Sequence, residues 1–495
     1  MLKIEEIKRF IDEDATSVKK KNARVGLRYY EAEHDILNSR LFYYNTDGVL
    51  VEDKTRSNVK ICHPFFTELV EQLAAYMMSF DDNPIRAKDN ADGLQKHLDK
   101  YFDDDFWAEV YDLIIGADSK GFEYIYAYKN AENRLAFQCA DSMGVVEVRE
   151  KDTDDGCKYV IYWYVDRMDK SGKEIKRIQV WSESDVTYYV QSGETGKIEL
   201  DKGVETNPRP HVIYKDPKSG KRMGYGLGFI PFWRMDNNRK QHSGIRPIKA
   251  LIDDYDMMMC GLSNNLADFD TPLHVVHGFQ GDNLDELQQN LKTKKIVGVD
   301  AEGGVSVQTV DIPYQARQAK AVEDENNIYR FGMGFNSSQV GDGNITNVVI
   351  RSRYTLLDLK ANKMEVRLRK LLKELLKVVL AEINKEEEKD YQVSDVYFEF
   401  TRNVMTNETE NIANELIQAQ TEQTKVTTIL NVAAAIGDEE TLKAICEAMD
   451  LDYEEVKAKA PAPASPEEEL FGAMDTLEGV MTDEQTAEAG AAAIS

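Results

Sequence analysis

Apolar residues recur along the chain with two different periods, and the change of period divides it. Helical spacing runs through residues 3–43, 64–79 and 93–117. From residue 122 onward, short β-rich segments such as KYVIYWYV and DVTYYV alternate with turn clusters such as DKSG and GETG. This pattern predicts an antiparallel meander of hairpins. Residues 1–247 are therefore predicted to form one α+β domain.

The second half of the chain is predicted to be mostly helical. Its predicted elements are helix 247–269, short strands and turns around one brief helix over 270–313, helix 314–335, a loop over 336–347, helix 348–386, strand 393–403 and a small helical bundle over 408–458. The part of the longest helix up to residue 380 alone would span about 50 Å at the usual rise per residue. Residues 461–495 hold eight acidic residues and no basic one. We expect 459–495 to be a disordered acidic tail.

The longest helix carries an apolar and a basic stripe. The apolar stripe advances by steps of four and three residues: Leu357, Ala361, Met364, Leu368, Leu371, Leu375 and Val378. The helix up to residue 380 holds nine basic and three acidic residues, and its basic band comprises Arg351, Arg353, Lys360, Lys363, Arg367 and Lys370. Two interpretations stay open. The stripes form either a coiled-coil-like packing seam with a solvated face, or a basic band that faces acidic neighbouring subunits or DNA.

The loop between the last two long helices, FGMGFNSSQVGDGNITNVV, is almost uncharged. Its glycines permit positive φ and its asparagines tolerate the left-handed region, so several conformations are accessible. Its glycine spacing matches no phosphate-binding motif. Side chains that would contact phosphates weakly, together with the glycines between them, are Asn336, Ser337, Ser338, Gln339, Gly341, Asp342, Gly343, Asn344, Thr346 and Asn347. A plain linker is the alternative.

Charge and cysteine usage narrow the class of protein. The 495 residues carry a net charge of −27, whereas tight duplex binders carry a basic footprint that neutralises phosphates. The sequence shows no signal core and no long apolar run, so we expect an intracellular protein without a membrane segment. Five cysteines without C-x-x-C spacing are expected to be reduced. Because N-glycosylation occurs in secreted proteins, we do not expect the two N-x-S/T sequons of the loop to be glycosylated.

Catalytic and metal-binding motifs are not found in the sequence. GYGLGF lacks the final glycine of a dinucleotide loop, and no Walker, HExxH or GxSxG motif occurs. His274 and His277 stand three apart on a predicted strand and point to opposite faces, so they cannot share one ion. We therefore expect no catalytic residue, no metal site, no cofactor and no enzyme activity. A metal-dependent nuclease, whose carboxylates would cluster only in the folded chain, is the alternative from a different class.

Three segments carry a resemblance to a known family. They are YYEAEHDIL at 29–37, NVKICHPFFTELVEQLAAYMMSFDDNPI at 58–85 and FIPFWRMDNNRKQHSGIRPIKALIDDYDMMMCGLSNNLADF at 229–269, which includes the paired asparagines Asn237 and Asn238. With the helices and loop that follow, their order resembles the portal proteins of tailed double-stranded DNA phages, of the siphophage type. The resemblance covers about residues 20–460.

The resemblance implies an α+β portal fold assembled as a ring with an axial channel. The parts it implies are a wing over 1–247, stem helices at 248–269 and 314–335, a strand-rich clip over 270–313, a tunnel loop facing DNA over 336–347, a long wing helix over 348–386, a wing strand over 387–407 and a helical crown over 408–458. The ring would hold about twelve subunits. Acidic residues of the stretch 252–256 would pair with the basic band of a neighbouring subunit.

The resemblance also implies a function and partners. DNA would be packaged and ejected through the ring at one capsid vertex, in weak, non-specific contact with its wall. The implied partners are the terminase, head-completion or adaptor proteins, and the major capsid and scaffold proteins. The protein would reside in the virion, and in the host cytoplasm during assembly. A portal-like ring of a defective prophage or of a gene-transfer particle fits the same sequence.

Overall fold

The computed structural model describes residues 2–459 with gaps, in two units, 1–405 and 406–495. Outside the described residues lie 1, 55, 89–92, 131–133, 150–155, 169–171, 194–195, 216–221, 270–272, 280–286, 288–298, 309–312, 337–346, 403–407, 450–452 and 460–495. The predicted acidic tail and most of the predicted brief helix after residue 280 fall there.

Two helices open the chain. α1 (Ile4–Thr16) and α2 (Val18–Tyr30) are separated at Ser17, whose hydroxyl accepts a hydrogen bond from the Lys20 backbone N–H at 3.2 Å. This contact is a helix N-cap, which satisfies a backbone donor left free in the first turn. A serine that caps a new helix therefore divides a region that its periodicity alone presents as one element.

The periodicity predicted helix as far as residue 43, but α2 ends at Tyr30. After the short 3-10 helix η1 (Asp35–Asn38), β1 (Phe42–Tyr44) pairs antiparallel with β2 (Leu50–Glu52). The Asn45 side chain accepts hydrogen bonds from two backbone N–H groups of the connecting turn, at 3.0 and 2.9 Å, and Gly48 takes a φ of 75°. The aromatic LFYY segment and this turn chemistry outweigh the helical spacing.

One predicted helix is two helices. α3 (Phe65–Met77) agrees with its prediction, but the helix expected over 93–117 is divided into α4 (Leu94–Tyr101) and α5 (Asp104–Lys120). Asp103 ends the first and caps the second, because its carboxylate accepts a hydrogen bond from the Phe106 backbone N–H at 3.1 Å. The sequence does not single out this N-cap, because Asp103 is the first of three consecutive aspartates.

The β-rich region forms antiparallel sheets, as predicted. One has the order β14-β4-β5 and the other the meander β10-β9-β8-β7-β6, with β11 paired to β9. The strands are β4 (Phe122–Lys129), β5 (Leu135–Ala140), β6 (Val145–Val148), β7 (Tyr159–Met168), β8 (Glu174–Trp181), β9 (Asp185–Ser192), β10 (Ile198–Leu200), β11 (Arg209–Pro210), β12 (Val212–Lys215), β13 (Arg222–Tyr225) and β14 (Phe232–Asp236). β12 and β13 form a separate pair.

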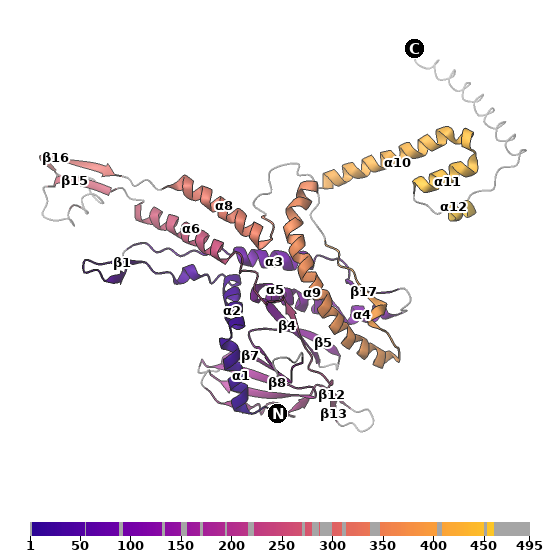
Figure 1. Ribbon diagram of the computed structural model, residues 1–495, viewed down its shortest axis with the longest axis horizontal. Coiled ribbons are helices and arrows are strands. Elements are labelled where there is room, and N and C mark those ends of the chain that lie inside the picture. Colours follow the sequence, from indigo (N-terminus) through magenta and orange to yellow (C-terminus); the bar gives the residue numbers. More distant parts are fainter. Residues whose placement is uncertain are drawn as a thin grey trace, which may run out of the picture. The chain divides into compact units, whose positions relative to one another are not determined.

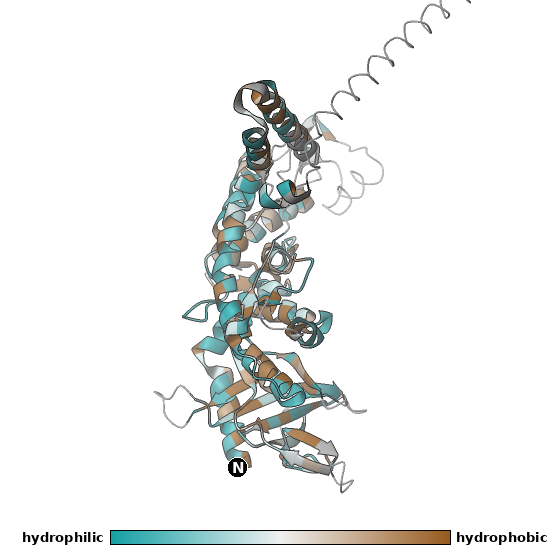
Figure 2. Cartoon of the chain, turned by 90° about the vertical axis from the view of Figure 1, so that its right-hand side faces the viewer, coloured by the Kyte–Doolittle hydropathy of each residue, from teal (hydrophilic) through white to brown (hydrophobic). Residues whose placement is uncertain are grey.

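The longest helix, α9 (Asn347–Glu387), is built into the main core. The buried members of its predicted apolar stripe are Leu357, Ala361, Met364, Leu368, Leu371 and Leu375. Val378 is half-buried, and the next residue, Val379, is fully buried in its place. The stripe packs against α3 and β14 of the same chain, so it is an intramolecular seam. Figure 2 shows hydrophobic and hydrophilic segments alternating along the helices.

The region between the sheets and α9 is a helix pair joined by a hairpin. α6 (Lys249–Phe269) leads to β15 (Leu273–Phe279), which pairs antiparallel with β16 (Val299–Gln308), and α8 (Tyr314–Gly332) returns. Because the hairpin connects the end of α6 to the start of α8, it lies beyond the far end of the pair (Figure 1). This order of elements agrees with the sequence prediction.

The chain after α9 is only partly strand. A 3-10 turn, η4 (Val393–Asp395), precedes β17 (Val396–Phe398), which pairs with β3 (Ile85–Ala87). The predicted strand over 393–403 is thus correct for three residues. The second unit contains α10 (Glu408–Ile436), α11 (Asp438–Ala448) and α12 (Tyr453–Lys459), in agreement with the predicted helical bundle.

Candidate functional site

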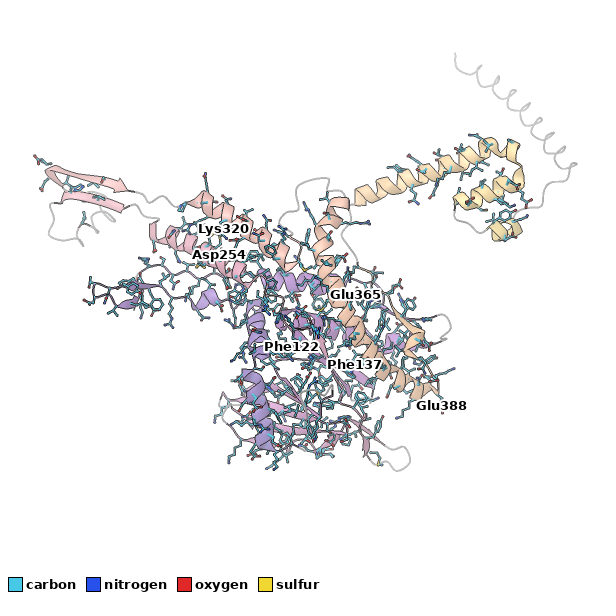
Figure 3. All side chains as sticks on the ribbon, in the orientation of Figure 1. Phe122, Phe137, Asp254, Lys320, Glu365 and Glu388 are labelled. Atoms are coloured by element: carbon cyan, nitrogen blue, oxygen red, sulfur yellow. The ribbon has the colours of Figure 1, made fainter. Side chains whose placement is uncertain are left out.

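The helices α6 and α8 lie side by side and run antiparallel. Lys320 on α8 places Nζ 2.8 Å from Oδ2 of Asp254 on α6, and it also pairs with Asp324 on its own helix (Figure 3). Farther along, the Arg317 guanidinium lies 3.5 Å from the carbonyl oxygen of Met258. Exposed ion pairs contribute about 1 kcal/mol or less. These contacts therefore set the register of the pair more than its stability.

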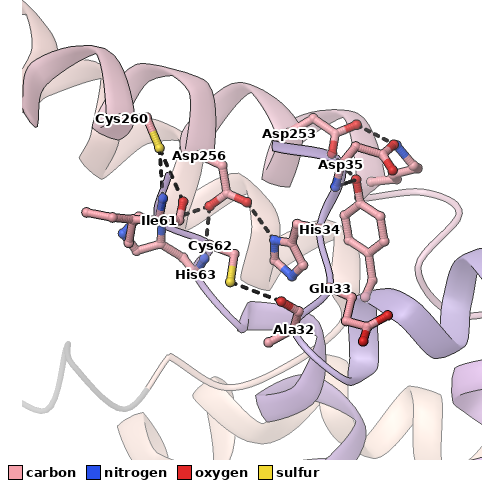
Figure 4. Close-up of polar contacts among 12 residues, drawn as sticks. Ala32, Glu33, His34, Asp35, Ile61, Cys62, His63, Asp253, Asp256 and Cys260 are labelled. Carbon is pink, nitrogen blue, oxygen red and sulfur yellow. Dashed lines mark hydrogen bonds and ion pairs between the residues drawn. The ribbon is translucent and has the colours of Figure 1, made fainter. Parts of the chain in front are cut away.

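Near its start, α6 is tied to the N-terminal segment through a buried carboxylate (Figure 4). Asp256 is fully buried, with Oδ2 2.5 Å from His34 Nδ1 and Oδ1 2.8 Å from His63 Nδ1. Burial alone would raise the pKa of the Asp256 carboxyl, but hydrogen bonds with His34 and His63 outweigh it and lower that pKa. The His34 ring stacks on Tyr29 at 4.5 Å between centroids. The base of α6 is thus fixed by a compact polar cluster.

Residues 57–63, here called the strap, run extended along α6 in a regular register. Alternate backbone N–H groups donate to side chains one helical turn apart: Ser57 to Asp268, Val59 to Asn264, Ile61 to Cys260 and His63 to Asp256, at 3.1, 2.6, 3.2 and 2.9 Å. Two extended residues rise about 6.6 Å and four helical residues about 6 Å, so the two repeats match over three turns. Lys60 adds a hydrogen bond from Nζ to the Leu37 carbonyl oxygen at 2.9 Å.

The acidic stretch 252–256 is satisfied within the chain. Asp253 pairs with Lys249 at 2.7 Å, Asp254 pairs with α8 as described above, and Asp256 is buried. The expectation that this stretch pairs with the basic band of a neighbouring subunit is therefore wrong for Asp256. The other two carboxylates already have counter-charges in their own chain. The chain supplies these counter-charges from the preceding turn of α6 and from α8, which sequence spacing did not reveal.

The end of α8 is held by close packing. Met333 takes the left-handed conformation with φ 58°, and the Gly334 N–H donates to the Tyr329 carbonyl oxygen at 3.0 Å, which closes the helix. A Cβ atom on Gly332 or Gly334 would overlap Leu69 of α3. These two glycines are needed for close approach to α3. The conformational freedom predicted from the glycine content is not their role.

The predicted tunnel loop leaves from a fixed support. Gln72 of α3 pairs with both backbone groups of Phe335, Nε2 to O at 2.7 Å and N to Oε1 at 3.0 Å. The Phe335 ring stacks on Tyr354 of α9 at 4.8 Å, and Asn336 donates to Glu325 at 3.0 Å. Residues before and after the loop are therefore clamped together. Outside the described residues lie its predicted DNA-facing members Ser337, Ser338, Gln339, Gly341, Asp342, Gly343, Asn344 and Thr346, together with the side chain of Asn347, which opens α9.

The predicted basic band separates into two kinds of residue. Arg351, Lys363 and Lys370 are exposed, and Arg353 and Arg367 are half-buried. Lys360 differs, because its Nζ lies 2.7 Å from Oδ2 of Asp118, a fully buried carboxylate on α5. Its ammonium group neutralises a charge inside the chain. The prediction that Lys360 belongs to the basic band is therefore corrected, because its ammonium group pairs inside the chain and does not face a neighbour or DNA.

The paired asparagines of the third motif build the turn before α6. Asn237 donates from Nδ2 to Asp118 Oδ1 at 3.1 Å and to the His242 carbonyl oxygen at 3.1 Å. Asn238 donates to the same carbonyl oxygen at 2.6 Å and accepts from the His242 N–H at 3.0 Å. Asp118 thus joins α5, α9 and this turn. The motif that carries the family resemblance has a structural explanation here.

The described part of the chain offers neither a metal-holding cluster nor a membrane-spanning helix. Those residues contain no group of three or more His, Cys, Asp or Glu side chains placed to hold a metal ion. In the same part of the chain, no helix is both long and apolar enough to span a bilayer. His274 and His277 lie on β15, paired with Val307 and Gly304 of β16.

Sequence reasoning missed the cluster around Asp256. Its members come from segments about 30 and 220 residues apart, so no local spacing reveals them. One signal was present, since His34 lies in YYEAEHDIL, His63 in NVKICHPFF and Asp256 in LIDDYD, all within the segments that carried the resemblance. The three segments meet at the base of α6.

Comparison with known proteins identifies the class that this fold and helix pair define, the structural proteins of tailed-phage heads. The family model described as phage portal protein, SPP1 Gp6-like, matches residues 9–455, and the chain belongs to this family. It is similar to the portal protein of Bacillus phage SPP1, with 26% identity over 348 residues that span 70% of this chain and 66% of that protein. It is also similar to the portal protein of Clostridium phage phiCD119, with 22% identity over 408 residues that span 76% of this chain and 84% of that protein. The resemblance drawn from the sequence is confirmed.

Proposed function

We propose that this chain is the ring-forming portal subunit through which a phage genome enters and leaves its capsid. Membership of the portal family supports this function. The observation that carries the proposal is the clamped loop. α8 passes directly into residues 336–347 and then into α9, while the stacked rings of Phe335 and Tyr354 hold the two ends together. Such a support fixes the ends of the two helices between which the predicted tunnel loop runs.

We assign the parts of the portal as follows, from the order of the elements. The wing comprises 1–247, 348–386 and 387–407, the stem 248–269 and 314–335, the clip 270–313, the tunnel loop 336–347, the crown 408–458 and the tail 459–495. The clip would dock the terminase and later the head-completion or adaptor proteins. Contacts with the major capsid and scaffold proteins, and residence in the virion after assembly in the host cytoplasm, follow from the same function.

Charge supports a conduit that does not grip its cargo. Every phosphate contact adds salt-sensitive affinity, so a chain with a net charge of −27 presents few sites that would hold DNA. In the described part of the chain we find no ion pair at Lys363, Arg367 or Lys370. We assign this remaining basic band to the interface between subunits or to the DNA channel. Replacing Lys363 and Arg367 by glutamate should impair ring assembly in the first case and DNA transport in the second.

Electron microscopy of the purified full-length chain tests the ring directly. Rings with a central channel wide enough for a DNA duplex are expected, about twelve subunits each. A compact monomer at micromolar concentration would contradict the proposal. Deleting Ser338–Gly343 should leave the rings intact and reduce DNA packaging or retention. Normal packaging by that variant would assign the loop to a plain linker.

We propose a structural and not a catalytic role, with no cofactor or metal. Incubating the rings with duplex DNA and Mg²⁺ or Mn²⁺ checks this, and strand cleavage that follows the protein through purification would contradict it. The genome neighbourhood distinguishes a functional phage from a defective prophage or a gene-transfer particle.

A further inference from the structure

The hairpin of β1 and β2 exposes apolar side chains on both of its faces. Phe42, Tyr44 and Leu50 are 54, 73 and 54% exposed, and Tyr43 and Val51 are exposed as well. An isolated two-stranded hairpin is marginally stable in water. An exposed patch of this size, rich in tyrosine and phenylalanine, is typical of an interaction surface.

The hairpin is held in place although it is uncovered. Its turn is fixed by the Asn45 side chain, and its second strand continues toward the strap, whose backbone is bonded to α6 as far as Asp268. The Asn58 side chain also reaches the Ser39 carbonyl oxygen, at 3.5 Å, on the segment that enters the first strand. A pre-positioned surface loses little conformational entropy when it binds. The strap thus presents the hairpin beside α6 (Figure 1).

Exposed apolar side chains also lie on the helix pair α6–α8. Leu266 of α6, and Tyr314 and Val322 of α8, are each more than half exposed. A closed ring needs heterologous interfaces, in which one patch of each subunit meets a different patch of the next. Rotation about the ring axis preserves height along that axis. Two patches that neighbour each other in one chain are therefore at similar heights in adjacent chains, where they can meet.

The geometry points to the β1–β2 hairpin as an arm that docks on the α6–α8 pair of a second copy of this chain, an inference that rests on the proposed ring. A second copy of this chain is the expected partner, because the α6–α8 pair carries exposed apolar side chains and the strap fixes the hairpin at the same level along α6. Covering the three aromatic rings would bury roughly 250–450 Å². With the aliphatic neighbours, this is a large share of the roughly 800 Å² per partner that a standard interface buries.

Substitution of the hairpin tests the arm in the full-length protein. The variant Phe42→Ser, Tyr44→Ser and Leu50→Ser removes three apolar side chains that contribute little to the monomer, because they are exposed there. The matched control Val165→Ser, Met168→Ser and Leu200→Ser removes three side chains of similar exposure from strands β7 and β10. Sedimentation velocity and electron microscopy measure ring formation against protein concentration, and circular dichroism checks that both variants fold.

We expect the hairpin variant to need roughly a thousandfold more protein for ring formation, since each of the three covered side chains contributes about a factor of ten. The control should assemble like the unsubstituted chain. If both variants assemble equally well, the inference that the hairpin docks on a second copy is wrong, while the ring proposal still stands. If the unsubstituted chain also stays monomeric, the ring proposal itself fails and the arm fails with it.

Cross-linking identifies what the arm touches. A benzophenone side chain in place of Tyr44 should, on irradiation of the rings, give a product of twice the subunit mass. Its cross-linked peptide should map to residues 249–269 or 314–332 of the second copy. Cross-links to another virion protein in assembled particles, with none between copies, would assign the hairpin to that protein and overturn the inference.

Discussion

The ion pair between Lys360 and Asp118 gives the sharpest test of how the chain holds α9. Asp118 is fully buried, while the Lys360 side chain retains 15% exposure. Replacing Lys360 by methionine keeps the aliphatic packing and removes the charge. Breaking a fully buried pair costs about 3–5 kcal/mol, because it leaves an unpaired buried charge. Since Asn237 still donates to the carboxylate and Lys360 is partly hydrated, we expect a loss of about 2–3 kcal/mol.

Urea unfolding followed by tryptophan fluorescence measures this loss. All four tryptophans lie before residue 234, so the signal reports the first unit alone. The matched control is Lys363→Met, an exposed position on the same helix, expected to change stability by about 0.5 kcal/mol or less. The unfolding midpoint of Lys360→Met should fall by about 0.5–1 M urea. Equal midpoints for the two variants would falsify the assignment of Lys360 to the core. Adding Asp118→Asn to Lys360→Met should then cost less than the sum of the single changes.

Three further predictions concern the base of α6 and the loop. The pKa of Asp256 is lowered in the folded chain, so the stability that its charge contributes is present above the unfolded pKa of about 4 and is lost as pH falls through the folded pKa. Asp256→Asn should therefore reduce stability at pH 7, and in acid-unfolding curves the loss of stability below about pH 4 should be less steep for this variant. Gly334→Ala should cost about 1–3 kcal/mol by overlap with Leu69, and Leu69→Val should recover part of that loss in the double variant, whereas strict additivity would show that the two sites do not touch. Asn264→Ala removes the acceptor for the Val59 N–H, and hydrogen exchange at Val59 should accelerate while exchange in the sheets stays unchanged.

The sequence predicted the elements with strong periodicity and missed those decided by single polar side chains. The seam of α9 was predictable because its apolar residues repeat at helical spacing over many turns, and the structure buries nearly all of them. Breaks at Ser17 and Asp103 were missed, since a capping side chain interrupts a helix without changing the apolar pattern around it. The start of β1 was predicted as helix because LFYY has helical spacing with the residues before it.

Contacts over long sequence separation were beyond local patterns. Nothing near Lys360 indicates that Asp118 lies beneath it, since the two are 242 residues apart. The predicted basic band therefore included Lys360, which belongs to the core. The glycines at the end of α8 show the same limit, because composition suggests flexibility and only the position of Leu69 shows that space is the reason.

The polar contacts of the first unit are graded by burial, and this grading fits a conduit. Asp118 with Lys360 and Asp256 with His34 are buried, so salt screens them little, whereas the Lys320–Asp254 pair between α6 and α8 is nearly half exposed and is screened. The buried contacts hold α9 on α5 and the base of α6 on the N-terminal segment at low and high salt alike. The exposed pair fixes only the register of two helices that would line a channel, at a cost of about 1 kcal/mol when it opens. In the proposed ring, a subunit that holds its core firmly and its α6–α8 pair lightly would adjust its inner surface to passing DNA without loosening its core.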